Sequence, residues 1–559
     1  MALEMEPPAE KMSGEDLSAR DKKTFNASPD DTELELGEME DHGGDSGLHR
    51  SLSTRHLVMV AIGSSIGMGL WLGSGTSLIE GGPASIFLGY FLSGTIVWAV
   101  NQSIGELAVL YPVPSAFVRW TGMFVDPSMA FALGWAYWFS YPITLANELQ
   151  GVCTVLSFWT DKVPIAGWIS IFVVVIICIN IGAVTLFGEF EVVASSIKFF
   201  WIIVVIISGI VISAGGAPKG GAIGFRYWNQ EPFLHGFKGF LRVMPTCIFA
   251  MSGSEACGLV AAETANPLKS VPRAVKSIWL RLSLFYLLGG LIVTITVSPK
   301  DPNLFGGSGV NASPFVIAYR NAGLEPMAHI MNAVIFISVL SSGSVSGYAG
   351  SRTIMGLANL RMAPEVFTRC DKTGRPWYGL VSVFVIGGGL AYLNVDHSGA
   401  TVFGWFSNLT SLFTLFGWGC ICLAHIRFRW AWAAHGHTPA DLPWKTWSYP
   451  FAAYWGLFWC ILLIIVEFYL AVWPLGEKSS AENFFANFVS VPAILVLYIA
   501  ARIYYRGAWW IKAEKVDLVT GRRFYSQKSI EQARGGGHGG GIKGFFRGVL
   551  GVFTSESSY

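Results

Sequence analysis

Residues 62–70 read Ile-Gly-Ser-Ser-Ile-Gly-Met-Gly-Leu and lie inside an otherwise apolar stretch, 55–78. A second run, Ser-Gly-Ser-Glu-Ala-Cys-Gly at 252–258, interrupts the apolar stretch 240–262 in the same way. Glycine and serine weaken a helix, so we expect each helix to unwind there and to expose main-chain N–H and C=O groups. Small residues of this kind also pack membrane helices together, but two interruptions in matching positions favour a binding site.

The composition places these stretches in a membrane. Of the 559 residues, 52% are hydrophobic and only 13% are charged, and the mean hydropathy is +0.48. An average soluble domain carries about a quarter charged residues, so this composition argues against a water-soluble globular protein. Twelve apolar segments are long enough to cross a bilayer core about 30 Å thick. They are 55–78, 84–110, 128–156, 165–187, 192–214, 240–262, 275–298, 328–358, 377–395, 400–424, 450–473 and 485–506.

The form of these segments decides the fold class. They are runs of helix length instead of ten-residue alternations, and lipid requires every backbone amide to be bonded internally, so a helical bundle is favoured over a β-barrel. We therefore predict an all-α membrane protein with twelve transmembrane helices, of which the first and the sixth are broken. Broken helices at equivalent positions in two halves of a chain indicate a transporter with an inverted repeat.

The charge distribution predicts three regions. Residues 1–50 hold 14 acidic and 5 basic residues and should form a disordered cytosolic tail. The transporter domain is expected over 51–506, and a cytosolic C-terminal tail with a Gly-rich hinge over 507–559; its last part either lies on the inner membrane surface or is disordered. The loops on the side of the termini carry 11 basic residues against 7 on the other side, so the positive-inside rule places both termini in the cytosol.

Unwound main chain at the middle of a membrane suits a zwitterion. The N-terminus of a half-helix would face a carboxylate, while freed carbonyls and a nearby acid would receive an ammonium group. Ionisable side chains inside spans are costly, and each is a candidate for function. We place function ahead of structure for Glu148, Lys198 and Glu255, and structure ahead of function for Glu106, Arg352 and Glu467.

Other classes of protein lack support in the sequence. No Walker glycine-lysine loop, His-Glu-x-x-His motif or spaced Cys/His set is present, which counts against an ATP-driven pump, a zinc membrane protease and any metal or other cofactor. No set of nucleophile and base that would indicate an enzyme is found, and no nucleic-acid partner is expected. The partners that we expect from these features are a small zwitterionic substrate, protons and membrane lipids.

At these residues the chain resembles the fungal amino acid permeases of the yeast amino acid transporter family, within the amino acid, polyamine and organocation superfamily. The resemblance covers about residues 51–525 and is closest to the general amino acid permeases. Its marks are the runs 62–70 and 253–255, Ala-Glu-Thr-Ala-Asn-Pro-Leu-Lys-Ser-Val-Pro-Arg-Ala at 262–274, Ser-Arg-Thr at 351–353, Gly-Arg-Pro at 374–376 and Cys-Leu-Ala-His-Ile-Arg-Phe-Arg at 422–429.

The resemblance implies a five-plus-five inverted repeat with two extra helices, and it implies roles for individual residues. Lys198 would shuttle the coupling proton, and Glu255 would take part in both binding and coupling. Phe249 resembles the aromatic gate of the family, and Thr410 would lie in the pocket for the substrate side chain. By similarity and by the argument above, the substrate-binding residues are Gly63, Ser64, Ser65, Ile66, Gly67, Glu148, Phe249, Ala250, Ser252, Glu255 and Thr410.

The function that follows is proton-coupled import of L-amino acids, of broad range, across the plasma membrane by alternating access. Met68, Trp71 and Met251 depart from the usual residues of the family and bear on the substrate range. The alternative is a receptor that senses amino acids with little transport. Lysines and serines in the N-terminal tail, among them Lys11, permit modification by ubiquitin and contact with trafficking machinery under either hypothesis.

Overall fold

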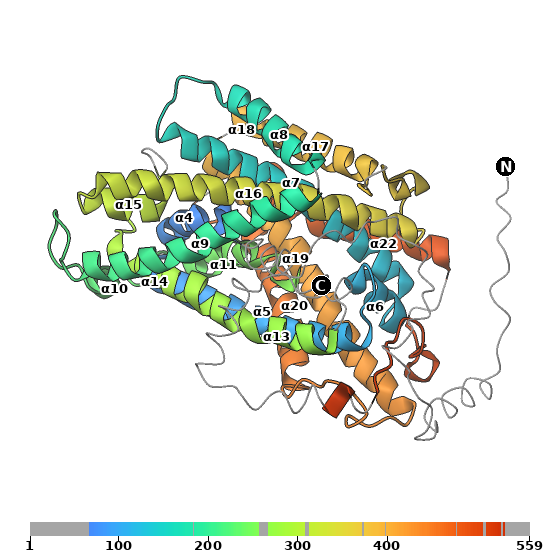
Figure 1. The fold of residues 1–559 in the computed structure, drawn as a ribbon. Coiled ribbons are helices and arrows are strands. Elements are labelled where there is room, and N and C mark those ends of the chain that lie inside the picture. The colour runs from blue at the N-terminus through green and yellow to red at the C-terminus, as the bar shows by residue number, and fades with distance from the viewer. Residues whose placement is uncertain are drawn as a thin grey trace.

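The computed structural model describes residues 66–182, 184–256, 267–307, 312–371, 374–396, 398–476, 478–506, 510–526 and 529–531. Over these residues the regular structure is helical, and a single isolated bridge pairs Leu304 with Ala312 (Figure 1). The prediction of an all-helical membrane protein is confirmed. The predicted tail 1–50 and most of the C-terminal tail lie outside the described residues.

The long helices are α5 (Pro83–Leu110), α7 (Pro127–Ser157), α8 (Ile165–Ile181), α9 (Val184–Ser213), α16 (Glu325–Asn359), α17 (Trp377–Ala391), α19 (Gly399–Ala434), α20 (Phe451–Val472) and α22 (Ser490–Tyr505). Most of the long helices follow the predicted segments, but α9 begins eight residues before the predicted segment 192–214 and α19 ends ten residues after the predicted segment 400–424. Shorter elements complete the remaining segments: α3 (Met68–Trp71), α4 (Gly73–Gly81), α11 (Gly236–Met251), η1 (Ser254–Ala256), α13 (Pro267–Arg281), the π-helix η2 (Leu282–Leu288), α14 (Gly289–Thr296), α18 (Leu393–Asp396) and α21 (Ala481–Phe488). Four further short helices lie between the spans: α6 (Ala116–Phe124), α10 (Arg226–Gln230), α15 (Pro314–Asn321) and η3 (Glu365–Thr368).

Six helices in the described part of the chain are long and apolar enough to cross a membrane. They are α5, α9, α16, α19, α20 and the helical stretch 377–395. The pair α21 and α22, bent by 65°, makes a seventh if it forms one span. Helix α8 and the stretch 282–296 are apolar but shorter, and α7 is long but less apolar. A multi-span membrane protein is therefore clear, while the count of twelve spans and the inverted repeat stay predictions.

Local sequence explains where several of these helices begin. Pro127 opens α7 after Asp126, whose carboxylate accepts the Met129 N–H at 3.0 Å as an N-cap. The same carboxylate receives Arg502 Nη1 at 3.0 Å, which fixes the start of α7 to α22. Gly82 adopts a φ of +84° directly before α5, a conformation that favours glycine.

A described helix starts within the first glycine-rich run and another ends directly before the second. Helix α3 begins only after Gly67, and the backbone breaks again at Leu72 before α4. Helix α11 ends at Met251, the backbone turns away at Ser252, and Gly253 has a φ of +82° before the 3₁₀ turn η1. The first part of the predicted first span and residues 257–266 lie outside the described residues.

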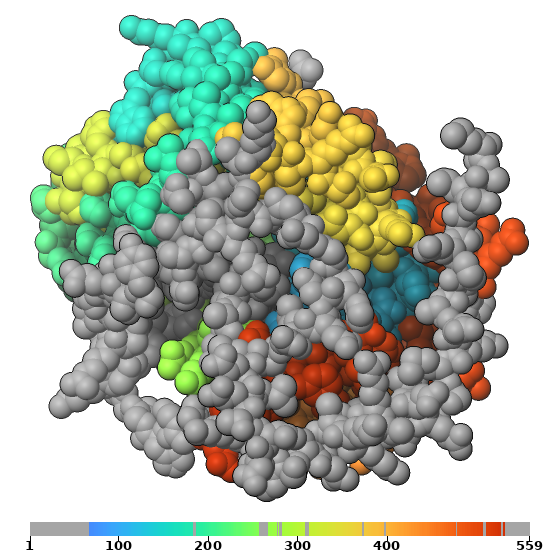
Figure 2. Space-filling view, turned by 45° about the vertical axis from the view of Figure 1, so that its right-hand side comes forward, coloured from blue at the N-terminus to red at the C-terminus, as the bar shows by residue number. Residues whose placement is uncertain are grey.

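Helix α16 is the central element of the packing, since α7, α8, α9 and α17 all lie against it. Helices α5, α11, α19 and α20 pack together on the other side of α7 (Figure 1). The space-filling view in Figure 2 shows the turquoise α8 and α9 segment beside the yellow α16 and α17 segment. The short helix α3 contacts α11 of one group and α7 and α16 of the other, so it lies between them.

The segment 510–526 lies against one end of the bundle. Its backbone pairs with the end of α5, because the Arg523 N–H donates to the Leu110 carbonyl at 2.8 Å. Tyr111 Oη donates to the Leu518 carbonyl at 2.9 Å. The positive-inside rule predicts that this end faces the cytosol. Gly82, directly before α5, and Glu80, near the end of α4, lie at the opposite end of the bundle.

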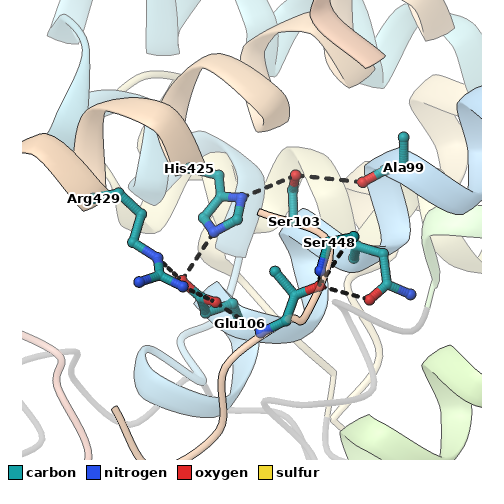
Figure 3. A network of polar contacts seen from close by, with 8 residues as sticks. Ala99, Ser103, Glu106, His425, Arg429 and Ser448 are labelled. Carbon is teal, nitrogen blue, oxygen red and sulfur yellow. Dashed lines mark hydrogen bonds and ion pairs between the residues drawn. The ribbon is translucent and has the colours of Figure 1, made fainter. Parts of the chain in front are cut away.

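A buried polar network joins α5 to α19 near the same end (Figure 3). Glu106 lies 2.9 Å from His425 Nε2, accepts Arg429 Nη2 at 2.9 Å and accepts the Thr446 N–H at 2.9 Å. His425 Nδ1 in turn lies 3.1 Å from Ser103 Oγ. The carboxylate is buried, and its partners satisfy both oxygens, so this network is a structural tie between helices.

Replacement of Glu106 should therefore destabilise the protein. Glu106→Ala leaves the Arg429 guanidinium buried without its counter-charge, which costs about 3–5 kcal/mol. We expect a clearly lower melting temperature for the purified protein in thermal unfolding followed by fluorescence. Glu482→Ala, at an exposed carboxylate of α21, is the matched control and should change little. Equal melting temperatures for the two variants would contradict the role of the network.

Candidate functional site

The start of α3 is bound by the side chain of a distant helix. The Met68 N–H donates to both carboxylate oxygens of Glu148 on α7, at 3.1 and 3.3 Å, and Ser342 Oγ on α16 donates to the same carboxylate at 3.0 Å. The first N–H groups of a helix have no partner within the helix and favour negative charge. The predicted site residues Gly67 and Glu148 are thus brought together at a position that accepts a carboxylate.

Glycine is required at two points of this segment because other groups come too close. A Cβ on Gly67 would lie 2.3 Å from Glu148 Oε1 and 2.8 Å from Ser342 Oγ. A Cβ on Gly69 would lie 2.7 Å from the Cα of Ala250 on α11. The two interrupted helices therefore touch through their backbones at Gly69.

Three serines on one face of α16 hold the surrounding groups. Ser338 Oγ donates to the Ile66 carbonyl at 2.8 Å, just before the break, and accepts Trp71 Nε1 at 2.8 Å. Ser341 and Ser342 follow at the next turn, since residues three and four apart share a helix face. Predicted site residue Ile66 is therefore held by a hydrogen bond to α16.

Ser341 connects the only lysine of α9 to a second carboxylate. Lys198 Nζ donates to Ser341 Oγ at 3.0 Å, and Ser341 Oγ donates to Glu191 Oε2 at 2.8 Å. Both ionisable side chains are fully buried, and Glu191 Oε1 has no hydrogen-bond partner among the described residues. Glu148 is bound by Ser342, the next residue of α16 after Ser341. The cluster, defined as Glu148, Glu191 and Lys198, holds two acids and one base.

Glu191 is the functional candidate that the sequence analysis missed. The predicted fifth span began at residue 192, which left Glu191 outside the membrane, but α9 begins at Val184. Its spacing of seven residues from Lys198 places both on one face of the helix, and this spacing is the signal that could have identified it.

The carbonyl groups at the end of α11 are already hydrogen-bonded. The Phe249 carbonyl accepts the Ser252 N–H at 3.1 Å and Ser252 Oγ at 2.7 Å. The Ala250 carbonyl accepts Tyr286 Oη from the π-helix η2 at 2.6 Å. An ammonium group bound at these carbonyls would therefore share or displace the hydroxyl of Ser252 or Tyr286.

The predicted residues Phe249 and Thr410, and Asn147, which was not predicted, differ in how their side chains are partnered. The Phe249 ring is buried and packs edge-on against Phe403 with ring centroids 5.9 Å apart. Thr410 Oγ1 on α19 and both polar side-chain atoms of Asn147 on α7 are buried without a hydrogen-bond partner among the described residues. Such atoms in a native protein call for an explanation, for example a site that a ligand occupies.

Glu255 lies apart from the cluster in its hydrogen bonding. Its carboxylate accepts Tyr137 Oη of α7 at 2.7 Å and Trp418 Nε1 of α19 at 3.2 Å. It therefore ties the turn after α11 to α7 and α19, and no hydrogen bond in the described part of the chain links it to Lys198. Gly63, Ser64 and Ser65, also predicted to bind substrate, lie outside the described residues.

Within the described ranges, no group of three or more His, Cys, Asp or Glu side chains is placed to hold a metal ion. The arrangement instead offers a helix start, main-chain groups that side chains of other residues bind, and a small cluster of buried ionisable groups inside an apolar bundle. These features define a multi-pass membrane protein of the transporter class.

The family follows from comparison with known proteins. The amino acid permease family matches residues 56–512, and the chain belongs to that family. It is 41% identical to the general amino-acid permease GAP2 of Candida albicans over 493 residues, which cover 87% of this chain and 84% of that protein. It is 40% identical to the general amino-acid permease GAP1 of Saccharomyces cerevisiae (85% and 81% covered) and 39% identical to the cationic amino acid transporter 1 of Schizosaccharomyces pombe (87% and 83% covered). The resemblance found in the sequence is confirmed.

The lack of space for a side chain at position 67 gives a direct test of this site. Gly67→Ala forces a methyl group against Glu148 and Ser342, and we expect uptake of labelled L-amino acids to fall about tenfold or more while surface level is retained. Gly94→Ala on α5 is the matched control, because a Cβ there meets nothing within 4 Å. Unchanged uptake in Gly67→Ala would show that the start of α3 is not part of the transport site.

Proposed function

We propose that the protein is a proton-coupled symporter that imports L-amino acids of broad range across the plasma membrane by alternating access, with both termini in the cytosol. The observation that carries the proposal is the hydrogen bond from the Met68 N–H to Glu148, beside the adjacent serines Ser341 and Ser342. These serines bring the start of an interrupted helix next to the buried pair Lys198 and Glu191. The general amino-acid permeases among the relatives support the substrate class and the breadth of range.

The substrate carboxylate would compete with Glu148 for the N–H groups at the start of α3. Glu148 already shows that a carboxylate fits there, and the donors are main-chain groups that serve every amino acid alike. The substrate ammonium would lie near the carbonyls of Phe249 and Ala250. Asn147 and Thr410, with their unpartnered polar atoms, would face the variable side chain.

The proton would belong to the cluster as a whole. With both acids and the lysine ionised, Glu148, Glu191 and Lys198 carry one excess negative charge, which is expensive inside a membrane. One added proton makes the cluster neutral, and strongly interacting groups share such a proton. A substrate that displaces Glu148 from the Met68 N–H removes the partner of that carboxylate and so favours its protonation. Substrate and proton would thus bind together.

Movement would involve the two interrupted helices as one pair. The close approach of Gly69 to Ala250 means that α3 and α11 cannot slide apart without losing a backbone contact. The helices α7, α8, α16 and α17 pack on one another and would form the scaffold. Rocking of the pair against this scaffold would open the site first to one side and then to the other.

Lys198→Met tests the coupling. In vesicles with an acidic exterior and labelled amino acid, the wild type should accumulate substrate until a protonophore collapses the gradient. Lys198→Met should lose this gradient-driven accumulation, because its cluster keeps two acids without a base, and should retain binding. Lys162→Met, at an exposed lysine, is the control. Accumulation by Lys198→Met that remains sensitive to the protonophore would contradict the role of Lys198.

A wild-type protein that binds amino acids in the same vesicles and accumulates none would instead support the receptor hypothesis. A competition panel of the common amino acids against one labelled substrate defines the range. Both measurements use the full chain.

We expect Glu255 to support transport through the hydrogen bonds that its carboxylate accepts from Tyr137 and Trp418. Glu255→Gln keeps the size of the side chain but offers an amide N–H to either Tyr137 Oη or Trp418 Nε1, both of which donate to it now. We expect binding or coupling to be lost while surface expression stays intact. Tyr137→Phe, which removes one donor only, should give a milder loss. Wild-type transport kinetics in Glu255→Gln would exclude Glu255 from the mechanism.

A further inference from the structure

A polar cleft lies at the face opposite to the segment 510–526. It holds about 510 Å³ of space that no atom fills, part of it open to solvent, and its walls come from α4 and α11 on one side and α19, α20 and α21 on the other. Its polar lining consists of Glu80, Arg242, Asn408, Glu467, Asn483 and Asn487. The part of it that water-sized molecules can enter is about 80 Å³, enough for several water molecules or the polar end of a small ligand. None of these residues belongs to the site at Met68, so the cleft is a separate feature.

One wall of the cleft presents a guanidinium group with donors to spare. Arg242 Nε donates to Glu80 Oε1 at 3.1 Å, and both side chains are about a quarter exposed. The Nη groups of Arg242 make no hydrogen bond within the described residues. The planar fork of a guanidinium binds carboxylates through such paired N–H groups.

The facing wall presents a buried carboxylate with one unused oxygen. Glu467 on α20 is only 6% exposed; its Oε1 accepts Ser411 Oγ at 2.6 Å, while its Oε2 has no hydrogen-bond partner in the described part of the chain. A buried polar atom without a partner is costly and calls for an explanation. Beside it, Asn408 Nδ2 donates to Asn487 Oδ1 at 2.5 Å, which leaves amide groups of α19 and α21 at the same wall.

We propose that this cleft is a second binding site for a free amino acid, held by its α-carboxylate on Arg242 and by its α-ammonium on Glu467. A zwitterion fits better than a simple anion or cation, because the two walls offer an Arg fork on one side and an unpartnered carboxylate oxygen on the other. The proposal goes beyond transport through the central site and shares with the proposed function only the class of ligand.

The location gives the second site a connection to the central one. Helix α4 begins directly after the break at Leu72, and Glu80 lies near its end. Arg242 lies on α11, which ends at the break at Ser252. A ligand between Arg242 and Glu467 therefore bridges the interrupted pair to α20. Occupancy of the cleft would hold that pair in the arrangement seen here.

The test is equilibrium binding of tritiated L-leucine, L-arginine and L-glutamate in turn to the full chain in lipid nanodiscs. Gly67→Ala should weaken binding at the central site about tenfold or more, so binding that keeps its wild-type affinity in this variant reports the cleft. Adding Glu467→Gln should raise the dissociation constant of this remaining phase about 30-fold or more, since a buried charged partner is lost. Adding Arg242→Lys, which keeps the charge and loses the fork, should also weaken it. Adding Glu482→Gln, at an exposed carboxylate outside the cleft lining, should leave it unchanged.

Two analogues of leucine separate a zwitterion site from a site for a single charge. Isopentylamine lacks the carboxylate and isocaproate lacks the ammonium, and neither should compete for the remaining phase. Competition by isopentylamine as strong as that by leucine would make the cleft a cation site and overturn the proposal. The proposal would also be overturned if Glu467→Gln left the remaining binding unchanged. It would be overturned as well if a Gly67→Ala variant that melts like the wild type showed no remaining binding. Absence of any binding to the wild type would contradict the proposed function as well, which distinguishes the two failures.

Discussion

A polar group inside an apolar helical bundle has no water to bond, so a neighbouring helix must satisfy it. The hydrogen bond between the Met68 N–H and Glu148 is the contact of this kind on which the site depends, because it joins an interrupted helix to the carboxylate of α7. Ser342 fixes that carboxylate, and its neighbour Ser341 binds Lys198. Two adjacent serines of α16 thereby connect the carboxylate at the start of α3 with the buried Lys198. This proximity gives a physical basis for coupling substrate binding to proton binding.

Much of the fold could be predicted because hydropathy and segment length decide which residues enter a membrane. The segments 84–110 and 450–473 differ from α5 and α20 by one residue at an end. Short helices such as α6 and α15 could not be predicted in this way, since they lie between spans and carry no spanning pattern. The end of α11 at Met251, well before the predicted boundary at 262, follows from the same glycine-rich run that indicated a break.

The site was predictable only where a residue is unusual for its surroundings. Glu148 and Lys198 stand out because ionisable side chains are rare in apolar segments. Ser341 and Ser342 do not stand out, because serine is common in membrane helices, and only the packing of α16 against α7 and α9 gives them partners. Glu255 was predicted to share in the coupling with Lys198, and the two donors to its carboxylate come from α7 and α19.

The tight fit around Gly67 has a consequence for how such a chain can change over generations. Because the side chain at 148 fills the space that a Cβ at 67 would need, the two positions cannot drift independently. A larger residue at 67 becomes tolerable only together with a shorter one at 148, and a shorter one at 148 leaves the Met68 N–H without its acceptor. Variation at this point of the family should therefore occur as paired exchanges, an evolutionary linkage that packing alone imposes.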